Sequence, residues 1–221
     1  AAGSSGGYKL KKDRLVIKTN NPRKRASVHN TLDEHYRVSK RVWADATTLA
    51  EFMSELDAPP KEHARVSEKY ENGKSRAIYG VEPMHYAINT YATKGFEERL
   101  HLIPGLEKGA DGIQQLALEE VKRGITANPK IECTMLDYAD FNIHHTPRAQ
   151  ALIFNTFAKV GQEVGAHPDW VKANLWVAKA KYAMAAVFPG STKPTKVVQG
   201  MFSGTRSTDL VNTLLNLAIP N

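Results

Sequence analysis

The stretch QGMFSGTRSTDLVNTLLN, from Gln199 to Asn216, combines a flexible polar turn with an amphipathic helix. Ser203-Gly204 forms the turn, and Thr208, Asn212 and a further asparagine then recur every four residues, which places them in one polar stripe. Such a helix packs its apolar side on a core and presents hydroxyl and amide groups on the other, where they can bond sugar hydroxyls or base edges. The simpler alternative is that these polar groups face water.

A second stretch, LDYADFNIHHTP from Leu136 to Pro147, places acids directly after a short apolar strand candidate. Asp137 and Asp140 come where the chain leaves that strand, and Asn142 follows them. Carboxylates at such a point can hold Mg²⁺, which prefers oxygen ligands and keeps several waters. A divalent ion there would shield a triphosphate and stabilise an in-line displacement. The alternative is a turn in which Asp140 or Asn142 caps the next helix and the two histidines lie at the surface.

Zinc is a weaker option for the same stretch. His144 and His145 are adjacent, so their side chains point in different directions, and the single cysteine, Cys133, lies beyond the strand candidate. The sequence has neither the paired-cysteine spacing nor the HExxH spacing of common zinc sites. The pattern therefore favours an oxygen-liganded ion over zinc.

A third stretch, YENGKSRAIYG from Tyr70 to Gly80, predicts a hairpin around Asn72-Gly73, the favoured residues of a two-residue turn. Lys74 and Arg76 occupy alternate positions just past the turn, so both project from one face of a strand. Two cations on a rigid hairpin suit a triphosphate or a template backbone, because Arg engages phosphate with two hydrogen bonds and Lys acts as a point charge. The alternative is an ordinary hairpin with an exposed basic edge.

The remaining patterns predict many helices and few strands. We expect Asp45 to cap a helix whose buried face runs from Leu49 to Leu56, and Pro59-Pro60 to end it. Two long helices, 147–164 and 168–187, are expected to begin with proline near the first turn. The other expected helices span 83–96, 111–123 and 207–218, and the expected strands span 15–17, 63–70, 75–81, 131–136 and 196–199. Since strands and helices do not alternate regularly, the predicted fold class is α+β.

Composition and charge limit the possible function classes. The chain has 221 residues, of which 42% are hydrophobic and 24% charged, as is typical of a folded globular protein. The net charge is +7, and residues 1–80 carry most of it, with 16 basic and 10 acidic side chains. Such a surplus suits phosphate backbones but is also typical of a solvated surface. A single cysteine suits a reducing compartment, and no apolar run approaches the roughly 20 residues that cross a bilayer. We therefore expect no membrane partner.

Taken in chain order, these segments resemble the motifs of viral RNA-dependent RNA polymerases, most closely those of totivirus-like double-stranded RNA viruses. Gly73 to Gly80, GKSRAIYG, resembles the basic motif F of the fingers, and LDYADFN resembles motif A of the palm. The turn and helix match motif B residue by residue: Ser203-Gly204, three residues, Thr208, three residues, then Asn212-Thr213. This spacing is the most specific signal in the sequence. The resemblance covers roughly residues 60–221.

The resemblance implies the fingers and partial palm of a right-hand polymerase, mostly helical with few short strands. Residues 1–60 would be N-terminal or fingers elements, 61–130 the fingers with motif F, and 131–221 a partial palm with motifs A and B. Asp137 would be the catalytic metal-binding aspartate with Asp140 as a supporting acid, and the cofactor would be Mg²⁺ or Mn²⁺. Lys74 and Arg76 would bind phosphates. The residues that would guide the template and recognise the NTP ribose are Asn142, Ser203, Gly204, Thr208 and Asn212.

The family also needs a second acidic motif, usually Gly-Asp-Asp after motif B, and these 221 residues contain none. Asp137 and Asp140 alone cannot complete a two-metal site in that architecture. We therefore expect a second chain or a C-terminal segment to supply Gly-Asp-Asp and the thumb, and the isolated chain to be inactive. Once completed, the enzyme would catalyse template-directed nucleotidyl transfer, in which the RNA 3′-hydroxyl attacks the α-phosphate of an NTP. Its partners would be the RNA template, the product and NTPs, in the host cytoplasm, inside a viral particle or a replication complex.

Two other function classes stay open. The first is a non-catalytic RNA-binding scaffold, which salt-dependent RNA binding without metal-dependent NTP binding would favour. The second is a different metal-dependent phosphotransferase built on Asp137, Asp140 and His144, which would hydrolyse a simple phosphoester without a template. For the polymerase, we expect Asp137 to end a strand and Asn142 to lie within a few ångströms of the motif B helix, with Thr208 and Asn212 facing the same cleft.

Overall fold

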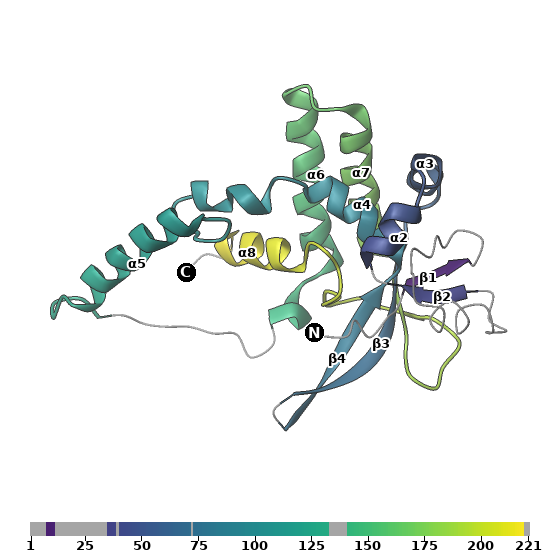
Figure 1. Ribbon diagram of the computed structural model, residues 1–221, viewed down its shortest axis with the longest axis horizontal. Helices are drawn as coiled ribbons and strands as arrows, with labels where there is room; N and C mark the ends of the chain where they lie inside the picture. Colours follow the sequence, from purple (N-terminus) through teal and green to yellow (C-terminus); the bar gives the residue numbers. More distant parts are fainter. Residues whose placement is uncertain (1–7, 12–34, 39, 72, 133–140, 219–221) are drawn as a thin grey trace, which may run out of the picture.

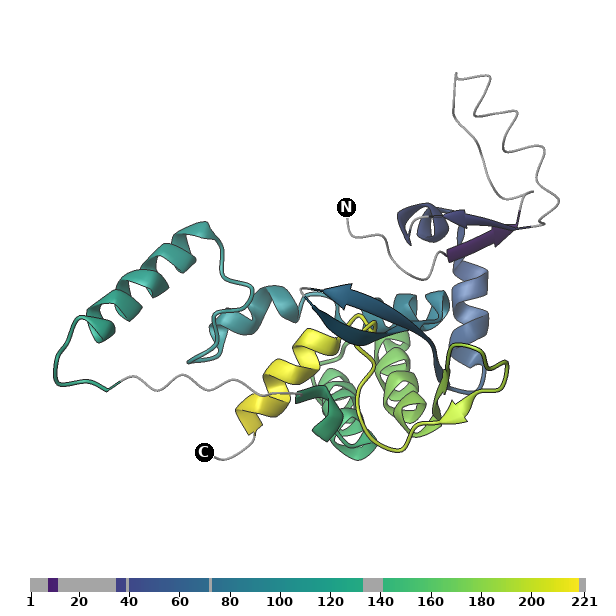
Figure 2. The ribbon, with the colours of Figure 1, turned by 90° about the horizontal axis from the view of Figure 1, so that it is seen from below.

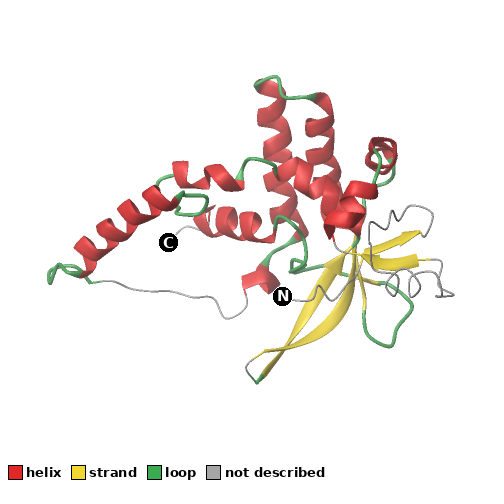
Figure 3. Cartoon of the chain, in the orientation of Figure 1, coloured by secondary structure: helices red, strands yellow, loops and turns green. Residues whose placement is uncertain are grey.

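A bundle of helices packs beside a small mixed sheet (Figures 1 and 3). The computed structural model describes residues 8–11, 35–38, 40–71, 73–132 and 141–218. This content confirms the α+β prediction. The helices are α2 (Lys40–Ala46), α3 (Leu49–Asp57), α4 (Pro83–Thr93), α5 (Gly112–Thr126), α6 (Pro147–Glu163), α7 (Pro168–Ala180) and α8 (Thr208–Ala218), with short 3₁₀ helices η2 (Glu97–Leu102), η3 (Phe141–His144) and η4 (Lys181–Ala183). The strands are β1 (Tyr8–Lys11), β2 (His35–Val38), β3 (Glu62–Glu71), β4 (Lys74–Val81), β5 (Met184–Val187) and β6 (Thr195–Lys196).

The main sheet has the strand order β4-β3-β5-β6. The β3–β4 hairpin is antiparallel, β5 joins β3 in parallel, and β6 is antiparallel to β5. Glu71 is paired with Lys74, which confirms the predicted two-residue turn, and Gly73 has the positive φ of +78° that such a turn needs. Strands β1 and β2 pair with each other in a separate two-stranded sheet. The predicted hairpin therefore forms one side of the main sheet.

The helical core lies between α4, α6 and α7, with α3 and α8 packed at its margins. Helix α7 contributes more buried residues to this core than any other helix, because apolar and small side chains occur on almost every side of it. A smaller apolar cluster lies on one face of the sheet. There Phe202 packs with Ala64 of β3 and with Met184 of β5. The buried residues of the larger core include Leu56, Ile88, Ala92, Phe154, Trp176, Val177 and Val211. The two clusters meet along the segment that precedes α8, since Met201 belongs to the first and Phe202 to the second.

The prediction that Asp45 caps a helix is wrong. Asp45 lies inside α2, and the cap of α3 is Thr48, whose hydroxyl accepts from the backbone N–H of Glu51 while the Glu51 carboxylate accepts from the N–H of Thr48. Leu49 is 75% exposed, so the buried face is narrower than predicted and begins at Phe52. The reciprocal Thr–Glu capping box satisfies two free backbone N–H groups, which a single aspartate three residues earlier cannot do. The helix ends just before the prolines, as predicted.

The long helix predicted over 168–187 ends at Ala180. After η4, residues Met184–Val187 form β5. In this strand Met184 and Ala186 are buried, and Ala185 and Val187 are half-buried. The alanine and methionine residues of this stretch have good helix propensity, but pairing with β3 satisfies the backbone and buries alternate side chains. Tertiary pairing therefore overrides local propensity here. The expected strand 196–199 is likewise displaced, because β6 consists of Thr195–Lys196.

Helix α5 extends away from the other elements in two perpendicular views (Figures 1 and 2). It begins with a capping box formed by Asp111 and Gln114, and it has no buried residue. Its apolar side chains are exposed, including Ile113 at 80%. Within the described ranges, no helix is both long and apolar enough to cross a membrane.

Several predictions lie outside the described residues. They are the strand at 15–17, most of the strand at 131–136, and the acids Asp137 and Asp140 together with Cys133. The expectation that Asp137 ends a strand therefore stays a prediction.

Candidate functional site

The site is built where the segment before α8 meets the hairpin. We call residues Ser203 to Thr208 the 203–208 loop. The Ser203 hydroxyl accepts a hydrogen bond from the backbone N–H of Tyr79 in β4, at 3.4 Å. The Tyr79 ring stacks on Phe202, with centroids 5.2 Å apart. Because β4 is the end strand of the sheet, the loop covers its otherwise open edge.

Gly204 is required by this close approach. A Cβ atom at this position would lie 2.0 Å from the carbonyl oxygen of Tyr79 and 3.3 Å from the Cα of Gly80. Neither atom belongs to a flexible side chain, so any larger residue must push the loop off the strand. The sequence predicted a flexible turn at Ser203-Gly204, whereas the structure gives the glycine a steric purpose.

A fully buried ion pair anchors the next residue of the loop. Thr205 donates its hydroxyl to Glu62 Oε1 at 2.7 Å, and Lys181 Nζ lies 2.7 Å from Glu62 Oε2. The side chains of Glu62 and Lys181 are both 0% exposed, and His85 Nε2 lies 3.8 Å from the same carboxylate. Charges removed from water are tolerated only when they are paired in this way. The start of β3, the start of η4 and the loop are thus joined at one carboxylate.

Burial and charge shift the pKa values of this cluster. Burial opposes ionisation of Glu62, but the positive charges of Lys181 and His85 and the hydrogen bonds from Lys181 and Thr205 together hold its pKa below the usual 4.5. Burial lowers the pKa of His85 to about 4, against the attraction of Glu62. His85 is therefore neutral near pH 7 while Glu62 is charged.

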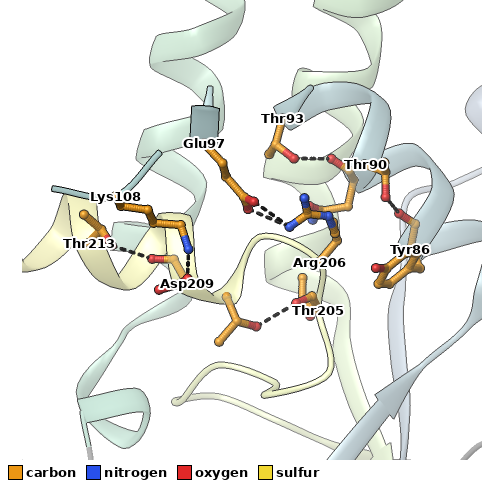
Figure 4. A network of polar contacts seen from close by, with 11 residues as sticks. Tyr86, Thr90, Thr93, Glu97, Lys108, Thr205, Arg206, Asp209 and Thr213 are labelled. Atoms are coloured by element: carbon orange, nitrogen blue, oxygen red, sulfur yellow. Dashed lines mark hydrogen bonds and ion pairs between the residues drawn. The ribbon is translucent and has the colours of Figure 1, made fainter. Parts of the chain in front are cut away.

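Two further ion pairs hold the loop and the start of α8 from the other side (Figure 4). Arg206 reaches both carboxylate oxygens of Glu97 in η2 at 2.7 Å, and Lys108 pairs with Asp209. The hydrogen bonds to Glu97 raise the pKa of Arg206 further above its already high value. Consecutive side chains of the loop therefore contact different elements, which fixes its path.

Thr208 has a structural role that the polar stripe did not indicate. Its hydroxyl is shared between the carbonyl oxygens of Phe202 and Thr205, at 2.9 and 2.8 Å. These bonds close the loop onto the first turn of α8. The hydroxyl proton of Thr208 is therefore used within the loop, and the expectation that Thr208 faces the cleft stays a prediction.

Asn212, one turn further along α8, lies beside Asn142. Its Nδ2 donates to Asn142 Oδ1 at 3.0 Å, which confirms the expected proximity of Asn142 to this helix. Its Oδ1 lies 2.8 Å from His145 Nε2. His145 is only 5% exposed, so the alternative interpretation with both histidines at the surface is wrong at this position, although His144 is exposed. Burial lowers the pKa of His145, and the hydrogen bond to Asn212 opposes that shift.

Backbone hydrogen bonds join the same two segments. The N–H of Gly200 donates to the carbonyl of His145 at 2.8 Å, and the N–H of Met201 donates to the carbonyl of Asn142 at 3.0 Å. The buried Gln150 amide donates to the carbonyl of Gly200 at 2.8 Å. Residues that are nearly 60 positions apart in the chain thus form one rigid unit.

The hairpin presents three exposed cations on one face. Lys69 is paired directly with Arg76, Arg65 with Gly80, and Lys74 with Glu71. Because side chains alternate across a strand, Arg65, Lys69 and Arg76 all project away from the face that carries Ala64 and Tyr79. All three residues are exposed. We call Arg65, Lys69 and Arg76 the cationic face.

Metal ligands cannot be assigned within the described part of the chain. There, no group of three or more His, Cys, Asp or Glu residues is arranged to hold an ion. Asp137 and Asp140 lie outside it, so their role stays a prediction.

Sequence reasoning missed five residues of this site. Arg65 and Lys69 follow from the hairpin register, because a two-residue turn fixes which residues share a face. His145 had a weaker signal, its place at the start of a long helix. Glu62 and Lys181 gave no local signal, since their partners are far away in the sequence.

Comparison with known proteins identifies the family of this chain. The family model described as viral RNA-directed RNA-polymerase matches residues 11–220. The chain is 27% identical over 157 residues to a probable RNA-directed RNA polymerase of Saccharomyces cerevisiae virus L-BC, covering 71% of this chain and 10% of that protein. It is 26% identical to the corresponding protein of Saccharomyces cerevisiae virus L-A, with 87% and 13% covered, and 26% identical to that of Leishmania RNA virus 1 - 1, with 69% and 17% covered. The chain thus spans less than a fifth of these relatives, and it belongs to the viral RNA-directed RNA polymerase family.

Proposed function

We propose that this chain forms the fingers and part of the palm of a polymerase that copies RNA, with residues 61–130 on the fingers side and 131–221 on the palm side. One observation carries the proposal. The three segments that resemble polymerase motifs are far apart in the sequence, yet the 203–208 loop lies on β4 and Asn212 is bonded to Asn142 at 3.0 Å. A site that reads one nucleotide needs such convergence.

The incoming nucleotide would be read by the polar groups at this junction. Asn142 and Asn212 are half-buried and carry amide groups that suit a ribose hydroxyl, and the exposed Ser203 carries a hydroxyl in the loop that precedes α8. Thr208 would act indirectly by holding the loop closed. Gly204 would let the loop lie flat on the strand.

The cationic face would bind phosphates. Arg76 of this face, together with Lys74, is proposed to hold the triphosphate, and Lys69 and Arg65 would bind the RNA backbone. Positive side chains on a rigid hairpin neutralise phosphate without changing shape. The net charge of +7 supports the same partner class.

Asp137 and Asp140 are proposed to hold Mg²⁺ or Mn²⁺, because carboxylate oxygens are the ligands that these hard ions prefer. The bound ion would supply positive charge beside the reacting phosphate. The RNA 3′-hydroxyl would attack the α-phosphorus, forming the new phosphodiester bond as the bond to pyrophosphate breaks. Asn142 and Asn212 would hold the ribose so that the α-phosphate lies in line with the attacking oxygen.

Other polypeptide is proposed to complete the site. The chain spans 10–17% of the length of its relatives, and its sequence contains no Gly-Asp-Asp. A C-terminal segment or a second chain would supply that motif and the thumb. We therefore expect no primer extension by the isolated chain.

Two binding measurements on the 221-residue chain test the proposal. We expect a fluorescent ATP analogue to bind only when Mg²⁺ is present, and Asp137→Asn to abolish this binding while Glu163→Gln, an exposed acid on α6, leaves it unchanged. Primer extension by the isolated chain that is lost in Asp137→Ala would show that no further polypeptide is needed. Nucleotide binding that ignores both Mg²⁺ and Asp137 would contradict the proposed site.

A non-catalytic RNA-binding scaffold is the second candidate, and the cationic face is the observation that favours it. Salt-dependent binding of single-stranded RNA without any metal-dependent nucleotide binding would support the scaffold over the enzyme.

A further inference from the structure

We propose that His145 is a positioning residue that orients the amide groups of Asn212 and Asn142 so that they present N–H donors to the sugar of a bound nucleotide. This inference rests on the proposed function of the site. No nucleotide contact of His145 itself is involved, because this residue is only 5% exposed and its ring lies 2.8 Å from Asn212.

The geometry makes a directed chain of three side chains. His145 Nε2 lies 2.8 Å from Asn212 Oδ1, and Asn212 Nδ2 donates to Asn142 Oδ1 at 3.0 Å. An amide oxygen only accepts, so Nε2 must carry the ring proton that reaches Asn212. The protonated Nε2 of His145 therefore determines that the Asn212 oxygen faces His145 and that the Asn212 nitrogen faces Asn142.

Reversal of this amide is costly while His145 donates. The Asn212 NH₂ group would then face an N–H donor, and its oxygen would face the oxygen of Asn142. Two polar contacts at about 3 Å would become repulsive at once. One unmade bond in a partly buried place disfavours the reversed orientation by about fivefold or more, which is enough to hold one orientation.

The fixed orientation determines what the site offers to a ligand. Both oxygens are used inside the chain of bonds, so the groups that remain for a ligand are the other Nδ2 hydrogens of Asn142 and Asn212, which are donors. Both asparagines are half-buried, so they are accessible, whereas His145 is not. Donors of this kind suit a hydroxyl oxygen, and a 2′-deoxy sugar would leave one donor unmatched.

The backbone holds His145 in place independently of its ring. Its carbonyl accepts from Gly200 at 2.8 Å, and Thr146, the next residue, caps α6 through its hydroxyl. Burial also lowers the pKa of His145, which keeps the ring neutral with a single proton. The histidine is thus fixed in position and chemically able to act as the reference donor.

Nucleotide selectivity of the 221-residue chain tests this role. The measured quantity is the ratio of the Kd for 2′-deoxyATP to the Kd for ATP, both with Mg²⁺. We expect His145→Leu to lower this ratio by about five- to tenfold, the effect of one lost hydrogen bond. His145→Gln, whose amide can donate from nearly the same point, should keep the ratio within about twofold.

Two outcomes would overturn the inference. The first is a His145→Leu variant that keeps its selectivity while both nucleotides bind more weakly by the same factor, because that is the result of a merely structural role. The second needs no variant: ¹⁵N NMR of the histidine rings should show His145 protonated at Nε2, and protonation at Nδ1 alone would exclude the donor. Absence of all nucleotide binding by the wild-type chain would instead count against the proposed function, and the NMR result would still decide the tautomer.

Discussion

The two ends of the β3–β4 hairpin use charge in opposite ways. At its base, Glu62 is 0% exposed and its carboxylate is shared by Lys181 and Thr205. Toward its tip, Lys69 and Arg76 stand opposite each other on an exposed face. At the base, the buried charges are paired with each other within the fold. The part toward the tip carries two like charges that face solvent, which suits the phosphate ligand that we propose.

This difference separates residues that hold the site together from residues that we propose to bind phosphate. Substitution at the base should be measured in the free energy of unfolding, whereas substitution at the tip should be measured in binding. The following experiments test that division in order of the expected change in stability.

Glu62→Ala should have the largest effect on folding. It leaves Lys181 charged and buried without its partner, which costs about 3–5 kcal/mol in the free energy of unfolding. Urea unfolding followed by circular dichroism measures this change. The control is Glu68→Ala, an exposed acid of the same strand bonded to Ser75, where we expect about 0.5 kcal/mol. Equal effects of the two substitutions would contradict the comparison.

Acid should destabilise the base through His85. The pKa of His85 is about 4 in the folded chain, below the ordinary value of 6.5. Between pH 6.5 and 4, His85 is therefore protonated in the unfolded chain but neutral in the folded chain. The free energy of unfolding should therefore fall as the pH falls from 6.5 to 4, by on the order of 3 kcal/mol from this group. Glu62, whose pKa is also lowered, loses its contribution only below about 4.5.

The measurement is the difference in pH dependence between the wild type and His85→Gln. His145 also has a lowered pKa and contributes in the same direction, but it is present in both chains and so cancels. Parallel curves for the two chains between pH 6.5 and 4 would show that His85 is not the group responsible.

Gly204→Ala tests the contact between loop and strand. The added Cβ would lie 2.0 Å from the carbonyl oxygen of Tyr79, and the resulting shift should cost about 1–3 kcal/mol. Gly80→Ala is the matched control, since its Cβ would meet the Arg65 carbonyl only at an ordinary 3.8 Å. Thermal unfolding compares the two variants, and a control as unstable as Gly204→Ala would mean that close approach is not the reason for the glycine.

Arg76→Gln should change stability least, by within about 0.5 kcal/mol, and RNA binding most. We expect weaker binding of a labelled single-stranded RNA and a salt slope that is smaller by about one, because one phosphate contact is lost. Lys159→Gln, which removes an exposed charge on α6, controls for net charge alone. Fluorescence anisotropy over a salt series measures both. Identical salt slopes for the two variants would remove Arg76 from the binding surface.

Local chemistry was sufficient for several features of the fold. Asn72-Gly73 specifies a two-residue hairpin, and the proline starts of α6 and α7 follow from the free N–H groups of a first helical turn. The spacing from Ser203 to Asn212 indicated the polymerase resemblance, and its helix begins within one residue of the prediction. These features depend on hydrogen bonds between residues only a few positions apart.

Long-range packing decided the rest. The strand β5 interrupts a helix-favouring stretch because β3 offers it a partner, and the 203–208 loop is shaped by Tyr79, Glu62 and Glu97, all more than 100 positions earlier in the chain. His145 is buried rather than at the surface, and its ring lies 2.8 Å from Asn212 of α8, which is distant in the sequence. Residue type and spacing therefore predicted the polymerase family. Only the tertiary contacts settled which polar groups are used within the fold, because the burial and the partners of distant residues have no local sequence pattern.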